Sequence, residues 1–203
     1  MYRIEKVLNH NTVIALHQDS HKEVLIMGKG VGFGRKVAER IEVRPEDRLY
    51  SLQKYKERGG AKEIVKSIAP EFLEVTNAVL DEAEKIFGKI DRMVLFPLAD
   101  HIAFAVKRIQ NHEQISNPLT EDIRVLFHME FKAAESIRPL LKKQFSIEIE
   151  DDEIGYVALH IHSAIEDEKV SQAMQMARSV RECISMVEEA IGKPIDIASL
   201  SYN

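Results

Sequence analysis

The chain has 203 residues, of which 45% are hydrophobic and 30% charged, enough apolar material for one or two folded domains with a polar surface. It lacks a run of about 18 apolar residues, and its start, MYRIEKVLNHN, lacks the apolar core of a secretory signal. Cys183 is the single cysteine, which excludes an intrachain disulfide and a cysteine-based zinc site. The composition therefore predicts a cytoplasmic protein with no membrane insertion.

The net charge of −5 is unevenly distributed along the chain. Residues 1–56 carry 11 Lys or Arg and 7 Asp or Glu side chains, a net of +4, so the remaining 17 basic and 26 acidic side chains give −9. A basic N-terminal segment favours a polyanionic partner such as nucleic acid. A net of +4 also lies within the ordinary range for a small domain, so charge alone leaves both interpretations open.

The first 56 residues show the alternating apolar pattern of short β-strands, with turn residues between them. A sheet this small leaves much of its apolar surface exposed, so we expect it to dimerise. Strands are expected at residues 2–8, 12–16, 23–27 and 48–52.

Beyond a polar segment at residues 53–62, apolar residues recur at helical spacing. Residues 170–191 place apolar residues every seven positions, which predicts one long helix. Its narrow apolar seam must dock on the other helices, on a second copy or on something absent. The other helices are expected to form a bundle and to run from Pro70 to Ile86, Leu98 to Ile109, Ile123 to Ile137 and Asp151 to Ile161.

Four of the nine glycines lie in the segment GKGVGFG at residues 28–34, which is followed by Arg35 and Lys36. The spacing fits neither the phosphate-loop signature nor the dinucleotide-binding fingerprint. Such a loop lets the backbone approach a partner closely, while Lys29 can meet phosphates and Phe33 can stack on an unpaired base. A twisted hairpin with Phe33 in the core explains the same residues equally well.

The eight histidines do not form a metal site by spacing. His160 and His162 lie about 200° apart on a helix and cannot chelate one ion together, and the zincin spacing is absent from the helical part. His101 and His160 flank apolar stripes, where a histidine is more often structural than functional. Without a nucleophile motif, the sequence predicts no metal, no cofactor and no enzymatic activity.

Two sets of motifs resemble one family. KVLNHN at residues 6–11 and MGKGVGF at 27–33 are similar to the RNA-binding co-antiterminator (CAT) domain of the BglG/SacY-type transcriptional antiterminators. DHIAFA at 100–105, Asn117–Pro118 and EIGYVALHIH at 153–162 resemble the first regulation domain (PRD) of the same proteins. The residues of these motifs are most similar to those of the glucose-operon antiterminators of Gram-positive bacteria. His10 and Lys29 depart from the asparagine and arginine common in relatives, which affects the RNA target.

The resemblance implies an α+β fold in which a small antiparallel β-sheet RNA-binding domain dimerises and precedes an all-α helical-bundle PRD. It places the CAT domain at residues 1–56, a linker at 57–65 and the first PRD at 66–169. Residues 170–203 would then hold the first helix of an incomplete second PRD.

The resemblance also implies a function. A homodimer would bind an RNA hairpin, the ribonucleic antiterminator, in the leader of a sugar-transport operon and keep a terminator from forming. In relatives, the histidines that match His101 and His160 accept phosphate from the sugar phosphotransferase system (PTS), whose sugar-specific enzyme II and phosphocarrier HPr are the expected partners. RNA contacts carry over to Asn9, Asn11, Gly28, Lys29, Gly30, Phe33, Arg35 and Lys36.

A second function class stays open at this point, because PRDs also occur in DNA-binding activators of sugar-utilisation genes. Residues 1–56 lack a helix-turn-helix pattern, which counts against that alternative.

Overall fold

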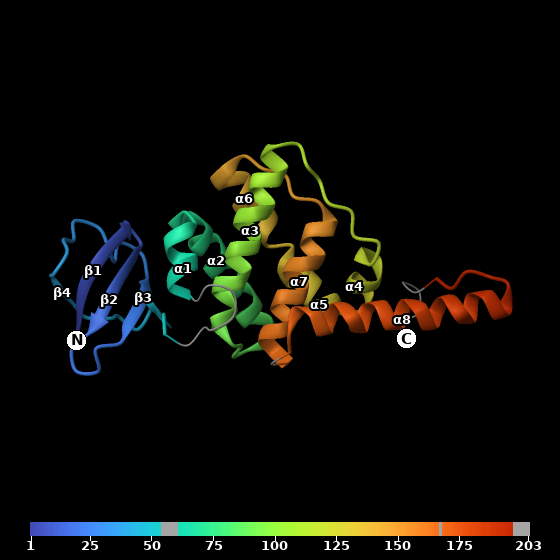
Figure 1. Cartoon of the computed structure of the whole chain (residues 1–203), viewed down its shortest axis with the longest axis horizontal. Coiled ribbons are helices and arrows are strands. Elements are labelled where there is room, and N and C mark those ends of the chain that lie inside the picture. The colour runs from blue at the N-terminus through green and yellow to red at the C-terminus, as the bar shows by residue number, and fades with distance from the viewer. Residues whose placement is uncertain (54–60, 167, 197–203) are drawn as a thin grey trace. The chain divides into compact units, whose positions relative to one another are not determined.

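The computed structural model describes residues 1–53, 61–166 and 168–196 (Figure 1). These residues form two compact units. The first unit holds residues 1–74 and 95–103, and the second holds residues 75–94 and the described residues from 104 onward.

In the part of the chain that the structure describes, five strands form one antiparallel sheet in the order β4–β1–β2–β3–β5. The sequence predicted four of them and missed β4, which is two residues long and pairs only with Tyr2 and Arg3 of β1. The strands are β1 (Tyr2–Asn9), β2 (Thr12–His17), β3 (Glu23–Met27), β4 (Arg40–Ile41) and β5 (Arg48–Ser51).

Both faces of this sheet are buried inside the first unit. On one face, the apolar residues of β1 to β3 pack with Val31 and Ile41 from the chain that follows β3. On the other face, Ile14, Leu25 and Tyr50 lie in register across three strands and are at most 6% exposed. The Tyr50 ring meets the ring of Phe96 with 6.0 Å between centroids.

Apolar residues on both faces of the sheet are thus covered within one chain, by the 31–41 segment and by helical residues of the same unit, whereas Leu49 on β5 stays 45% exposed. Dimerisation stays a prediction that rests on the family resemblance.

Helices follow the sheet, so the expected fold class, a small antiparallel sheet followed by an all-α part, is confirmed. In the second unit, α7 is the central helix and packs against α4, α5, α8 and η1. The elements are α1 (Ala61–Ser67), α2 (Pro70–Phe87), the 3₁₀ helix η1 (Arg92–Val94), α3 (Leu95–Gln110), α4 (Thr120–Leu126), α5 (His128–Ala134), α6 (Ile137–Phe145), α7 (Asp151–Glu166) and α8 (Val170–Ile191).

The expected helix from Ile123 to Ile137 is instead divided among α4, α5 and α6. At Phe127 the backbone leaves the helical region, with φ −116° and ψ 47°, while its side chain stays buried. The apolar period continues through the break because burial of the side chains, and not continuity of the helix, sets the pattern. Residues 61–65 of the expected linker lie in α1, and 57–60 lie outside the described residues.

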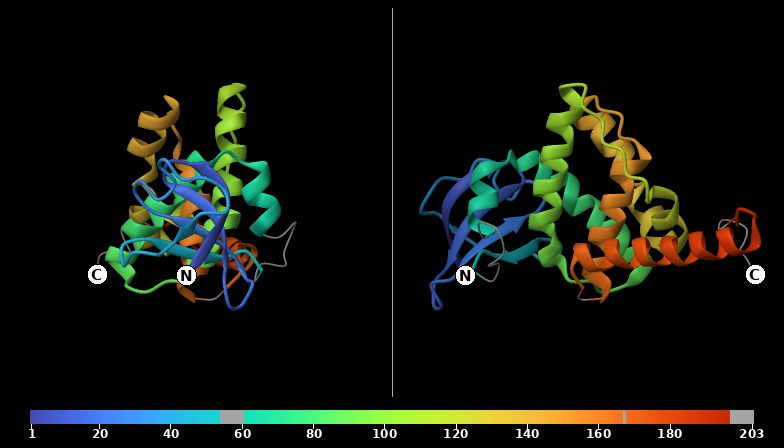
Figure 2. Two further views of the ribbon diagram at one scale, coloured as in Figure 1. Left: turned by 90° about the vertical axis from the view of Figure 1, so that its left-hand side faces the viewer. Right: turned by 45° about the vertical axis from the view of Figure 1, so that its right-hand side comes forward.

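Helix α8 packs through its first half only. Ala173 and Ala177 are fully buried where α8 meets α4 and α7, because small side chains let helices approach closely. Its second half extends past α4 (Figure 2), and Met186, Val187 and Ile191 are 69%, 48% and 54% exposed. The other helices of the chain, one of the three expected docking partners, therefore cover the apolar seam of α8 along its first half. The assignment of 170–203 to a second PRD stays a prediction, and residues 197–203 lie outside the described part.

Candidate nucleic-acid interface

The turn between β1 and β2 and the glycine-rich loop after β3 form one hydrogen-bonded structure. The Gly28 N–H donates to the carbonyl of Asn11, and the Gly32 N–H donates to the carbonyl of His10, each at 2.9 Å. The Gly30 N–H donates to the side-chain oxygen of Asn11, also at 2.9 Å. The turn thus fixes the loop backbone at three points, which reduces the entropy that a ligand would otherwise have to remove.

Two glycines allow this close approach. A Cβ atom at Gly32 would lie 2.2 Å from the backbone oxygen of Asn9, and one at Gly28 would lie 1.9 Å from Oδ1 of Asp47. Both distances are far inside van der Waals contact, so any other residue would push the loop away from its supports.

Arg44 and Asp47 hold the loop from a second direction. The Arg44 guanidinium donates to the Lys29 carbonyl at 2.9 Å and to Oδ1 of Asp47 at 2.7 Å. Burial by itself would raise the pKa of Asp47, but the hydrogen bonds and charge of Arg44 outweigh it and hold that pKa below its ordinary value. Sequence reasoning missed this pair, although Pro45 is typical of the second position of a turn and was the available signal.

The side-chain amides of Asn9 and Asn11 both direct their oxygens at the backbone. Oδ1 of Asn9 accepts from the Asn11 N–H at 2.9 Å, and Oδ1 of Asn11 accepts from Gly30. Their NH2 groups are therefore left to face a partner, and an NH2 group can only donate. In this structure both NH2 groups donate to the carboxylate of Glu74, at 2.7 Å from Asn9 and 3.4 Å from Asn11.

Phe33 lies at the outer part of the loop. Its side chain is 70% exposed, so the alternative interpretation of Phe33 as a core residue is wrong. The rings of Phe33 and His10 pack edge to face, with 5.3 Å between their centroids. An exposed, flanked aromatic ring of this kind offers a face on which an unpaired base can stack.

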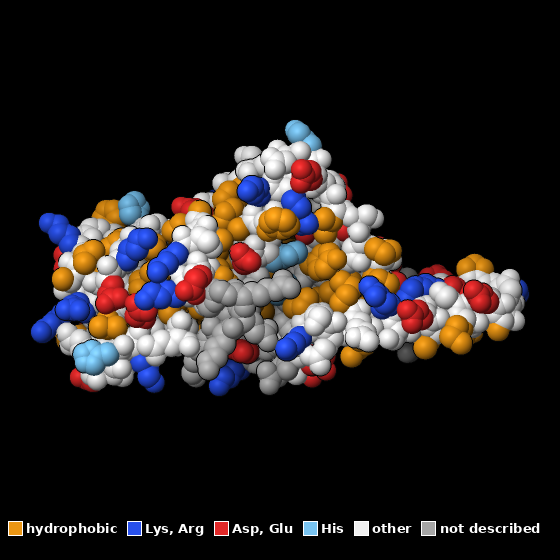
Figure 3. Space-filling model, viewed as in Figure 1, with side chains coloured by type: hydrophobic (Ala, Val, Ile, Leu, Met, Phe, Trp, Pro, Cys, Tyr) orange, Lys and Arg blue, Asp and Glu red, His pale blue; other side chains and the backbone are white. Residues whose placement is uncertain are grey.

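The basic side chains expected to meet RNA continue along the same loop. Lys29, Arg35 and Lys36 are all exposed, and the Arg35 guanidinium lies 3.8 Å from the Glu39 carboxylate. Lys and Arg side chains are spread over the sheet-bearing region in Figure 3. The structure thus joins the two asparagines and Gly28 and Gly30 by hydrogen bonds, and places the other four expected residues on the adjoining backbone.

The two expected phosphate acceptors lie in different surroundings. His101 is half-buried on α3, and His160 on α7 is 9% exposed. His162 faces another direction on α7, where its Nδ1 lies 2.9 Å from Oε1 of Glu130 and its ring packs on Phe127. The structure therefore gives His162 a structural environment and leaves His101 the more accessible of the two candidates.

A buried ion pair lies further along the helix that carries His101. Arg108, two turns after His101 on α3, donates to the carboxylate of Glu153, which is 1% exposed. The same guanidinium lies 4.9 Å from the centre of the Phe104 ring. Arg108 is thus already engaged by Glu153 and Phe104.

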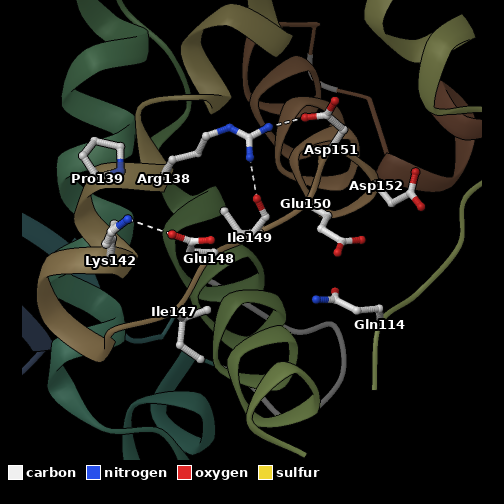
Figure 4. Close-up of a pocket in the computed structure, with 10 residues that line it drawn as sticks. All are labelled: Gln114, Arg138, Pro139, Lys142, Ile147, Glu148, Ile149, Glu150, Asp151 and Asp152. Atoms are coloured by element: carbon white, nitrogen blue, oxygen red, sulfur yellow. Dashed lines mark hydrogen bonds and ion pairs between the residues drawn. The ribbon is translucent and has the colours of Figure 1, made fainter. Parts of the chain in front are cut away.

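A hollow of about 850 Å³ lies beside α6 and the start of α7 (Figure 4). Its Arg138 is bound to Asp151 and to the Ile149 carbonyl, and its Lys142 is bound to Glu148 at 2.7 Å. Because these two basic side chains are already neutralised, the hollow is not prepared for an anionic ligand.

The described residues contain no group of three or more His, Cys, Asp or Glu side chains that could hold a metal ion. The same residues contain no helix long and apolar enough to cross a membrane.

Comparison with known proteins agrees with this arrangement. The CAT RNA binding domain family matches residues 2–59, and the PRD domain family matches residues 74–164. The "GlcA/glcB genes antiterminator" of Staphylococcus carnosus (strain TM300) is 31% identical over 205 residues, covering 99% of this chain and 71% of the relative. "Protein GlcT" of Staphylococcus epidermidis is 27% identical over 206 residues with the same two shares. The solved structure "Crystal structure of GlcT CAT-PRDI" matches with a TM-score of 0.68 and 30% identity, covering 81% of this chain and 98% of that one.

A CAT RNA-binding domain followed by a PRD defines a class of transcription regulators rather than enzymes. The chain belongs to this family, the CAT–PRD transcriptional antiterminators, as the resemblance of its motifs predicted.

Proposed function

We propose that the chain acts as a glucose-type antiterminator in the cytoplasm. It binds an RNA hairpin in the leader of a sugar-transport operon and keeps an overlapping terminator from forming. One relative is named as the antiterminator of the glcA and glcB genes, which supports antitermination. The observation that carries the proposal is the loop at 28–36, which is fixed to the 9–11 turn and still presents an exposed aromatic ring, cations and amide donors.

Each of these groups suits an RNA with unpaired bases. Phe33 stacks on an extruded base, and Lys29, Arg35 and Lys36 meet phosphates. Asn9 and Asn11 donate to acceptor oxygens of a base or the backbone. Gly28 leaves room for Asp47, and Gly30 adopts a φ of +72° that side chains rarely allow, so both glycines keep the loop in the shape that meets the RNA. Two copies of the loop, brought together in a homodimer, form the full groove.

The PRD supplies the control. HPr and a sugar-specific enzyme II transfer phosphate to His101 and His160, which adds about −1.5 to −2 charges by analogy with phosphorylated hydroxyls. The buried site of His160 cannot retain such a charge without rearrangement. We favour inhibition by phosphate on this PRD, with sugar uptake draining the phosphate and restoring RNA binding.

The test is selection of RNA by the full chain from a pool of hairpins with random loops and bulges, followed by gel shifts. We expect one family of hairpins to be enriched and to bind far more tightly than single-stranded RNA or duplex DNA. Preference for a DNA duplex would instead support the second candidate, a PRD-containing activator, and no enrichment would remove the RNA assignment.

The switch needs its own test. Incubation with HPr and the sugar-specific enzyme II, followed by mass spectrometry of acid-labile phosphate, should label His101 and His160. His101→Ala and His160→Ala should each lose one site, whereas His128→Ala, which removes an exposed histidine, should not. Label on neither histidine would overturn the switch while leaving RNA binding intact.

A further inference from the structure

One carboxylate occupies the outward-facing donors of the two asparagines. Oε1 of Glu74 accepts from Asn9, and Oε2 of the same side chain accepts from Asn11. The contact joins residues 65 and 63 positions apart, and all three residues belong to the first compact unit. A single carboxylate thus bridges the two amides that the proposed function assigns to RNA.

The orientation of both amides is imposed by the backbone around them. Their oxygens accept N–H groups of Asn11 and Gly30, so the amides cannot turn over without losing these bonds. Two NH2 groups that converge on one point form a seat for an oxygen acceptor, and a carboxylate resembles a phosphate in presenting two such oxygens. The seat therefore suits a phosphate group or a base carbonyl of RNA.

Glu74 is held at this place by its helix. It follows Pro70 by one turn on α2, and the preceding helix, α1, is tied to the sheet by Lys62. The Lys62 ammonium lies 2.5 and 2.6 Å from the two carboxylate oxygens of Glu23 on β3. The Glu74 contact is thus part of a set of bonds between the sheet and the first helices, and not an isolated surface pair.

We infer that Glu74 and RNA compete for this seat, so that the position of α2 controls the affinity of the sheet for RNA. The inference rests on the proposed function, because it assigns the same amides to the RNA contact. The carboxylate acts twice: it takes both donors, and its charge repels phosphates that approach them. RNA binding then requires α2 to release the seat, which couples the RNA surface to the helices that follow.

The test compares the full-length wild-type chain with Glu74→Ala, Glu74→Gln and the control Glu71→Ala. Glu71 is one turn earlier on α2, so its removal changes the net charge near the sheet by the same amount. The probe is the hairpin most enriched by the wild-type chain, measured by gel shift at fixed salt. We expect Glu74→Ala to bind roughly fivefold to thirtyfold more tightly, the size of a lost charge-assisted competitor. The affinity of Glu74→Gln should fall between those of the wild type and Glu74→Ala. Glu71→Ala should change the affinity by less than about twofold.

A second measurement reads the seat without RNA. In ¹H–¹⁵N NMR spectra, the side-chain NH2 signals of Asn9 and Asn11 should shift in Glu74→Ala and stay in place in Glu71→Ala. Equal RNA affinity in all variants, equal gains for both alanine variants, or unmoved amide signals would overturn the inference. If no hairpin is enriched by the wild-type chain, the proposed function itself fails, which is a distinct result from wild-type binding that Glu74 does not affect.

Discussion

The loop at residues 28–36 and the histidine-bearing helices α3 and α7 place their functional side chains in different surroundings. The loop is rigid in its backbone, through bonds to the 9–11 turn and to Arg44, and its functional side chains, Lys29, Phe33, Arg35 and Lys36, are exposed. On α7, His160 is buried in the centre of the second unit, and on α3 the residue two turns after His101 is tied to a buried carboxylate.

Under the proposed function, this difference separates the RNA-recognition site from the control site. A loop whose backbone is already fixed loses little conformational entropy on binding, so the loop itself need not rearrange once Glu74 has released the two asparagine amides. A histidine inside a packed unit can accept a charged group only if the packing changes, and that change is what carries a signal. Substitutions in the two regions should accordingly fail in different ways.

The largest effect is expected on the helical side. Arg108→Met removes the guanidinium that donates to the buried Glu153, and removal of one partner of a buried pair costs about 3–5 kcal/mol of unfolding free energy. The loss should appear in urea unfolding followed by circular dichroism. Arg178→Met removes an exposed arginine of α8 and serves as the control. Equal losses for the two variants would show that the Arg108 pair does not stabilise the second unit.

A change in the loop should weaken binding and leave folding unchanged. Phe33→Ala removes a stacking surface worth about 1–3 kcal/mol, which corresponds to roughly fivefold to 150-fold weaker RNA binding. Val37→Ala trims another exposed apolar side chain nearby and should have little effect. If both variants bind the enriched hairpin as the wild type does, Phe33 does not contact the RNA.

Gly32→Ala should lower both stability and RNA affinity, because it disturbs the fixed backbone of the 28–36 loop. The added Cβ would meet the Asn9 carbonyl, and an overpacked contact of this kind costs about 1–2 kcal/mol. RNA affinity should fall with it, since the loop moves off the turn. Gly155→Ala is the matched control, because its Cβ would find only ordinary contacts at 3.8 Å or more in a helix. A Gly32→Ala variant as stable as the wild type would contradict the close packing.

The sequence predicted the elements whose signals are local. α2 begins at Pro70 as expected, since proline suits a first helical position. The helix ends at Phe87, one residue before Gly88, whose φ of +76° favours glycine after a helix end. β4 was missed because two residues give no period, and the break at Phe127 was missed because the apolar period passes through it. Local pattern thus predicts which residues are buried better than where a helix ends.

The candidate site shows the same limit. The turn at 9–11 and the loop at 28–34 can be predicted from their asparagine and glycine content. Arg44 and Glu74 do not, because their contacts with Lys29 and Asn9 span 15 and 65 positions and depend on how the strands and helices assemble. Such long-range supports follow from tertiary packing and leave no spacing pattern in the sequence.

The smallest effects are expected from two aspartates that should respond to pH in opposite senses. Arg44 holds the pKa of Asp47 below the ordinary value of about 3.9, so the folded state binds fewer protons than the unfolded state. The stability that Asp47 contributes is present above about pH 4 and is lost as pH falls through its lower folded pKa. Burial raises the pKa of Asp122, and the charge of Arg181 at 3.8 Å offsets this only in part. Asp122 therefore costs stability at neutral pH, and the cost disappears as pH falls below its folded pKa.

Unfolding free energies of the wild type, Asp47→Asn and Asp122→Asn, measured from pH 7 down to about pH 2, check these signs. At pH 7, Asp47→Asn should be less stable than the wild type, because Arg44 loses its ionised partner and the loop loses a support. At pH 7 the unfolding free energy of Asp122→Asn should equal or exceed that of the wild type, and this difference in stability should shrink as pH falls. The first variant acts on the exposed binding loop and the second on the packed helices, so each sign belongs to one region. Loss of stability at pH 7 in both variants would mean that Asp122 is a stabilising anion and that the two regions do not differ in this respect.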